Sequence, residues 1–240
     1  MKLQEAPAMW GRDEVSNILD VARNNEFSTF ANLKSEMGRL IDIDLSFRKV
    51  IDGLNHSKDW FAAFFVLRAH SNFLAACRMG MSGQIPECYA LLRSCIENAL
   101  YGVFLAKNPE FRETWLRRHD SEEHKKVVRK EFKIGRMIEC AKSIDAKEGE
   151  VAQQLYEQTI DHGAHPNERA LMRSLQIEEK EDNVEFLSIY LDAAPDHLKP
   201  ILKTTAQVGV CTLSLFRPIY KERYDILGVT DALDHIKRGI

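Results

Sequence analysis

Residues 60–107, WFAAFFVLRAHSNFLAACRMGMSGQIPECYALLRSCIENALYGVFLAK, contain two long apolar stretches separated by a short turn. In the first stretch apolar residues fall on several sides of a helix, as in a helix buried at the centre of a fold. Pro86 is tolerated in the first turn of the second helix, which should end before Asn108-Pro109. The short connection between them predicts an antiparallel central pair, 58–81 and 86–107, in an all-α bundle.

Helical periodicity continues on both sides of this pair. Seven or eight helices are expected in a single domain, residues 1–240, with residues 1–11 and 225–240 loose. The outer helices are expected at 13–24, 28–54, 110–118, 121–143, 148–162 and 198–219. Two short apolar runs within 171–191 flank a polar stretch and fit either one small β-hairpin or two short helices.

The bulk composition is that of a globular protein: of 240 residues, 45% are hydrophobic and 29% charged. A net charge of −3 gives no general attraction to nucleic acid or to an anionic membrane. The most apolar run, residues 60–67, is far shorter than the roughly 20 residues of a membrane span. We therefore expect no membrane partner, and the N-terminus has no apolar leader.

The five cysteines are dispersed and form no Cys-x-x-Cys pair, which is typical of buried thiols in a reducing compartment. A cytoplasmic location is therefore expected. No glycine-rich phosphate loop, dinucleotide fingerprint or His-Glu-x-x-His segment is present, so no cofactor is expected.

Arg93 and Glu97 are the first candidate binding residues. They lie one helical turn apart and can pair along one face of the second central helix. An ion pair on the edge of an apolar stripe is desolvated and contributes little to stability, which leaves a role in specificity or binding as the alternative to a simple helix-flank salt bridge. Arg68, on the first central helix, should also need a partner, and Glu97 is the nearest expected carboxylate.

The segment Asp161-His162-Gly-Ala-His165-Pro is the second candidate. Gly163 should end the preceding helix, and Pro166 should hold His165 in extended geometry. His162, His165 and Asp161 allow a metal-dependent hydrolase as one hypothesis. Zinc sites usually have four ligands with tighter spacing, however, so a capped helix end is the simpler interpretation and no metal is predicted.

Arg118 and His124 are the candidate catalytic residues, separated by five others. This spacing is similar to the Arg-(four to six residues)-His pattern of the HEPN-like ribonucleases. That resemblance implies metal-independent cleavage of RNA, in which the pair would help a ribose hydroxyl attack its phosphate. Interleaved glutamates around the following lysines also fit a solvated helix face.

Two longer stretches, LLRSCIENALYGVFLAKNP at 91–109 and YEQTIDHGAHPN at 156–167, resemble uncharacterised bacterial helical families of unknown function. Those families combine an Arg-x-x-x-Glu helix with a later helix ending near His-Pro, and some accompany phage-defence genes. The resemblance spans roughly residues 57–220. It implies that Arg93, Glu97 and His165 matter, without implying an activity.

Taken together, these patterns favour a bacterial binding or regulatory protein, with the ribonuclease and the metal-dependent hydrolase as alternatives. Whether the protein is an enzyme is left open by the sequence. We expect a homodimer formed through helical faces, because the central helices are apolar on more than one side. A small anionic ligand or RNA is the expected partner, and Arg93, Glu97 and His165 are predicted to converge, with Arg68 and His162 nearby.

Overall fold

The computed structural model describes residues 5–54, 60–166, 168–173, 175–179 and 183–240. The chain is 78% helical, with twelve α-helices and one two-stranded antiparallel sheet in the described residues. The predicted all-α bundle with a small hairpin is therefore confirmed. The helix count exceeds the predicted seven or eight because one expected helix is divided, a short helix precedes the hairpin, and the C-terminal segment is helical.

The central antiparallel pair is confirmed as α3 (Trp60–Ser82) and α4 (Ile85–Lys107). Gly83 joins them with a positive φ of 88°, and a β-carbon there would meet the backbone of Asp192 at 2.5 Å. Glycine is therefore required at this turn. By length and composition α3 is long and apolar enough to cross a membrane, and 44% of its apolar window is buried inside the bundle.

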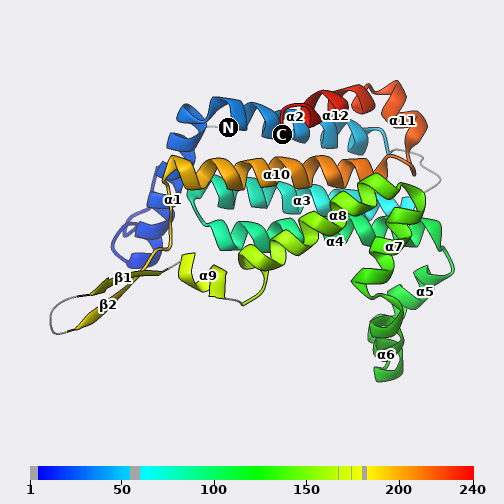
Figure 1. Cartoon of the computed structure of the whole chain (residues 1–240), viewed down its shortest axis with the longest axis horizontal. Helices are drawn as coiled ribbons and strands as arrows, with labels where there is room; N and C mark the ends of the chain where they lie inside the picture. Colours follow the sequence, from blue (N-terminus) through cyan, green and yellow to red (C-terminus); the bar gives the residue numbers. More distant parts are fainter. Residues whose placement is uncertain (1–4, 55–59, 167, 174, 180–182) are drawn as a thin grey trace.

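Helix α10 (Pro195–Phe216) lies across the central pair and completes the core (Figure 1). Two glycines allow it to approach closely. A β-carbon on Gly209 would lie 2.7 Å from the ring of Phe73 in α3, and one on Gly102 of α4 would lie 2.7 Å from the ring of Phe216. The three helices thus pack at a distance that only glycine permits at these positions.

Three expected boundaries were wrong. The break expected at 25–27, between helices 13–24 and 28–54, lies instead at Leu33, between α1 (Glu14–Asn32) and α2 (Lys34–Asp52). The expected helix 121–143 is divided at Phe132–Lys133 into α6 (Glu122–Glu131) and α7 (Ile134–Ile144). Residues 225–240 are not loose, because α11 (Lys221–Ile226) and α12 (Val229–Lys237) bury apolar side chains on the bundle.

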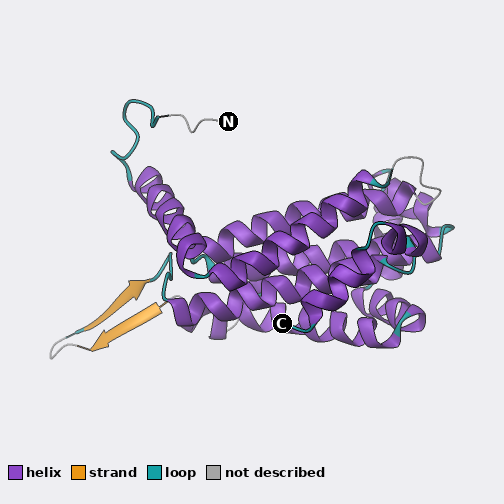
Figure 2. Ribbon diagram, turned by 90° about the horizontal axis from the view of Figure 1, so that it is seen from above, coloured by secondary structure: helices purple, strands orange, loops and turns teal. Residues whose placement is uncertain are grey.

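Other elements lie at the two ends of the bundle (Figures 1 and 2). At one end are α5 (Phe111–Leu116), a 3₁₀ turn (Arg117–His119), α6 and α7. At the other end are α9 (Glu168–Arg173) and the hairpin of β1 (Leu175–Glu179) and β2 (Val184–Ser188), paired with Ile177 opposite Phe186. Helix α8 (Ala146–Thr159) runs over α4 and continues as a π-helix (Ile160–Ala164).

Candidate functional site

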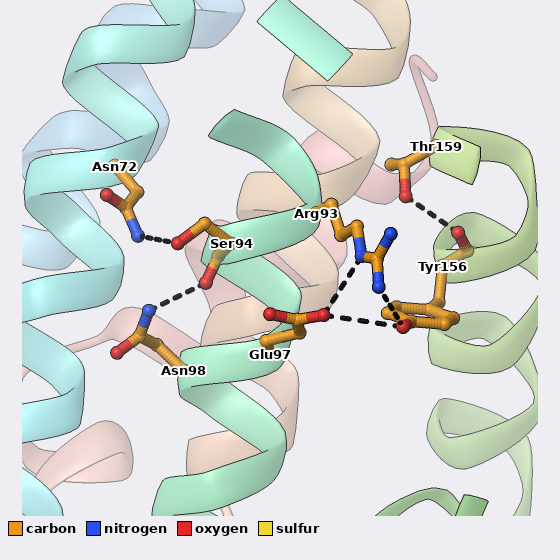
Figure 3. A network of polar contacts seen from close by, with 7 residues as sticks. All are labelled: Asn72, Arg93, Ser94, Glu97, Asn98, Tyr156 and Thr159. Atoms are coloured by element: carbon orange, nitrogen blue, oxygen red, sulfur yellow. Dashed lines mark hydrogen bonds and ion pairs between the residues drawn. The ribbon is translucent and has the colours of Figure 1, made fainter. Parts of the chain in front are cut away.

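The most developed polar cluster joins α4 to α8. Arg93 and Glu97 pair as their spacing predicts, with Nε of Arg93 2.9 Å from Oε1 of Glu97. Tyr156 of α8 completes the cluster: its hydroxyl accepts a hydrogen bond from Nη2 of Arg93 at 2.9 Å and donates one to Oε1 of Glu97 at 3.3 Å. Figure 3 shows the two α4 side chains projecting toward Tyr156.

Arg93 is held in place but is not saturated. A guanidinium has five N–H donors, and the structure shows two engaged, one by Glu97 and one by Tyr156. The side chain is 26% exposed, and no other described residue accepts from its remaining donors. Burial lowers the pKa of Arg93, but the hydrogen bonds and charges of Glu97 and Tyr156 outweigh it and hold the pKa above its ordinary value. The guanidinium is therefore always charged.

Glu97 supplies the acceptor of the cluster, and Tyr156 supplies a hydroxyl donor. Both hydrogen bonds to Glu97 use Oε1, and the second carboxylate oxygen points away from Arg93 (Figure 3). Burial, followed by the charge of Glu97, raises the pKa of Tyr156, so its hydroxyl keeps its proton and remains a donor. The cluster thus presents cationic donors and a carboxylate acceptor side by side.

The π-helix brings a histidine to the same face of α4. The His162 ring stacks on Tyr89, one turn before Arg93, with ring centroids 5.2 Å apart and planes inclined by 25°. Gly163 makes this approach feasible: its φ is 149°, and a β-carbon would lie 2.6 Å from Cα of Pro86 at the start of α4.

His165 lies just beyond the π-helix, exposed and on extended backbone, as Pro166 predicts. Its approach to Glu97 stays a prediction. Among the described residues, no group of three or more His, Cys, Asp or Glu side chains is arranged to hold a metal ion. Asp161, His162 and His165 therefore do not form a metal centre in this geometry.

The prediction that Arg68 pairs with Glu97 is wrong. Arg68 is exposed, and within the described part of the chain it makes no ion pair or hydrogen bond, so it does not join Arg93 and Glu97. The expectation of a partner assumed that Arg68 lies inside the bundle, because its helix is apolar on several sides. The structure places Arg68 on the exposed side of α3, as it does Phe64 and Leu67, and a guanidinium open to water needs no protein partner.

Arg118 and His124 lie at the far end of the bundle. Arg118 is exposed in the 3₁₀ turn, and His124 lies in the first turn of α6. Nδ1 of His124 is 3.0 Å from Oγ of Ser121, the residue that also caps this helix. One ring nitrogen of His124 is therefore committed to a capping interaction, which is a structural role that the sequence alone does not show.

A histidine and an aspartate form a further polar contact between α2 and α3. Nε2 of His70 is 2.6 Å from Oδ1 of Asp44, and the His70 ring stacks on Phe47. Burial raises the pKa of Asp44, but hydrogen bonds from Arg48 and His70 outweigh burial, so the pKa lies below its ordinary value. The contact between Asp44 and His70 links α2 to α3 at the edge of the hydrophobic core.

Sequence reasoning missed Tyr156 and the role of Tyr89. Tyr89, Arg93 and Glu97 recur every four residues on α4, so a polar row along one face was detectable. Tyr156 opens the quoted segment YEQTIDHGAHPN, yet no local pattern indicated that it would face Arg93. Only the packing of α8 on α4 decides that contact.

The fold and this cluster define an all-α bundle protein with an Arg–Glu–Tyr cluster between two helices. No protein-family model, no curated protein and no solved structure matches the chain.

Proposed function

We propose that this protein is a binding module and that its ligand is a small anion carrying a hydrogen-bond donor, bound at Arg93, Glu97 and Tyr156. The observation that carries the proposal is the pre-positioned Arg93, which is held by Glu97 and Tyr156 and keeps N–H groups that no other described residue engages. An anion accepts from the guanidinium, and a hydroxyl on the same ligand donates to the carboxylate.

The surroundings suit such a ligand. The pair is one-quarter to one-third exposed, so a ligand reaches it without unfolding the helices. Tyr156 fixes the guanidinium through both its hydroxyl and its ring, whose centroid is 5.1 Å from Cζ of Arg93. A fixed guanidinium loses less side-chain entropy on binding, which favours affinity.

The cellular setting is part of the same proposal. All five cysteines are free, three of them buried, which fits the reducing cytoplasm of a bacterium. The resemblance to helical families near phage-defence genes suggests a regulatory role for ligand binding there.

Inorganic phosphate is the probe, because at neutral pH it carries both negative charge and an O–H donor. We expect isothermal titration calorimetry to detect binding to the wild type. Arg93→Gln should weaken it about tenfold or more, since a hydrogen bond to a charged group contributes roughly 1.5–3 kcal/mol. Arg48→Gln is the matched control, because it removes another one-turn ion pair, Arg48 with Asp44, on a different helix.

The outcome that refutes the proposal is phosphate affinity equal in wild type and Arg93→Gln. The ribonuclease alternative is tested separately, by incubating single-stranded RNA with the protein in EDTA. We expect no cleavage. Cleavage that disappears in His124→Ala would establish the enzyme and displace the binding module.

A further inference from the structure

The outer side of α3 carries an uncovered apolar row. Its members lie within 40° of one line along the helix at 100° per residue, and they follow one another at spacings of 4, 3, 4, 3 and 4. This row, called the α3 seam below, consists of Trp60, Phe64, Leu67, Ser71, Leu74 and Arg78. All six side chains are exposed, and the four apolar ones are Trp60 at 57%, Phe64 at 57%, Leu67 at 46% and Leu74 at 40%.

The alternating spacing of 4 and 3 is that of a coiled-coil seam, where each side chain inserts between residues of a facing helix. An ordinary solvent-facing helix side carries charged residues at such positions. The seam therefore has the pattern of a helix–helix contact, although none of the helices that the structure describes covers it.

We propose that the α3 seam binds the α3 seam of a second copy of this chain, antiparallel, in a two-fold symmetric dimer. The spacing is palindromic about position 69. In an antiparallel pair Trp60 faces Arg78 of the other copy, Phe64 faces Leu74, and Leu67 faces Ser71. Each large side chain thus meets a smaller or complementary one, as an isologous interface requires.

Complementary chemistry at the ends supports this pairing. The guanidinium of Arg78 is held by Glu26 of α1, with Nε 3.0 Å from Oε1, and the side chain is 60% exposed. Opposite it in the antiparallel dimer lies the half-exposed indole of Trp60, the best cation–π acceptor among side chains. A parallel pair would instead place Arg78 against Arg78, with like charges in contact.

The seam exposes most of the apolar area that a standard dimer interface buries. A fully exposed aromatic side chain presents about 150–250 Å², so the four apolar seam residues together present roughly 300–400 Å². A standard interface buries about 800 Å² per partner, a little over half of it apolar.

Sedimentation equilibrium of the full chain tests the dimer. The wild type should have twice the 27.6 kDa chain mass, about 55 kDa. Leu67→Glu and Phe64→Gln should each give the monomer mass with unchanged circular dichroism, because both side chains are exposed. The control Ile226→Glu alters a side chain that is 83% exposed on α11, and it should leave the dimer intact.

Cross-linking tests the orientation. A mixture of Trp60→Cys and Arg78→Cys chains should form a disulfide between the two variants under oxidation, above the level of the unsubstituted chain. Trp60→Cys alone should not cross-link, because antiparallel packing separates the two copies of position 60 by about 27 Å along the helix. Cross-linking of Trp60→Cys alone would overturn the antiparallel arrangement.

Two further results would overturn the proposal. One is a wild type that remains at the monomer mass at high concentration. If that monomer binds phosphatidylcholine vesicles through Trp60 and Phe64, a lipid surface covers the α3 seam in place of a second copy. The other is a Leu67→Glu variant that stays fully dimeric.

Discussion

Replacing Gly209 with alanine should destabilise the protein, whereas the same replacement at Gly38 should stabilise it. Both glycines lie inside helices, α10 and α2. A β-carbon at Gly209 would lie 2.7 Å from Cε2 of Phe73 and 2.8 Å from Cγ2 of Ile43, and both of these side chains are fully buried. At Gly38 nothing lies within 4 Å of the added atom.

The magnitude follows from two opposing contributions. Alanine is favoured over glycine in a helix interior by about 1 kcal/mol, and this gain applies at both positions. Overpacking a dense core costs about 1–3 kcal/mol, and two contacts below 3 Å with immobile neighbours place Gly209 in the upper part of that range. The free energy of unfolding should therefore fall by about 1–2 kcal/mol in Gly209→Ala and rise by up to about 1 kcal/mol in Gly38→Ala.

Urea denaturation followed by far-ultraviolet circular dichroism measures both changes, with the slope against urea expected to stay the same. The pair of variants isolates packing, because the helix propensity contribution is common to both. If Gly209→Ala were stabilised as much as Gly38→Ala, the close approach of α10 to α3 would be refuted.

Three further predictions concern pH, thiols and the π-helix. Asp44→Asn should reduce the fall in the free energy of unfolding that the wild type shows at acid pH. The pKa of Asp44 is lowered in the folded protein, so its contribution to stability is present above about pH 4 and is lost as the pH falls through the folded pKa. Equal unfolding free energies of variant and wild type at about pH 6 and pH 3 would contradict this. A thiol reagent at about pH 8 should modify the half-buried Cys140 well before Cys88, because burial raises the pKa of Cys88 to about 12. Peptide mass mapping measures the order of modification, and equal rates at the two cysteines would contradict this prediction. Gly163→Ala should move His162 from α4 and weaken phosphate binding, since φ is 149° and the β-carbon would meet Pro86; unchanged binding in the same calorimetric assay would show that this turn does not position the site.

Local features of this protein could be read from the sequence because helix geometry is set by covalent structure and spacing. The central pair, α3 and α4, follows from two apolar stretches and a glycine turn. The contact of Arg93 with Glu97 follows from a separation of one turn. The turn at Gly163 was equally local, since glycine tolerates a backbone that other residues avoid.

Tertiary packing decided the rest. No spacing rule connects Arg93 to Tyr156, because they are separated by 63 residues and meet only where α8 crosses α4. Arg68 is on the outer side of α3 because no helix in the described part of the chain covers that side. A helix that is apolar all round does not reveal from its sequence which side will be covered. The C-terminal segment appears polar by itself, yet Val229, Leu233 and Ile236 are buried once α12 packs against the bundle. Burial is a property of the assembled helices, so a single helix pattern determines which residues share a face but not what that face meets.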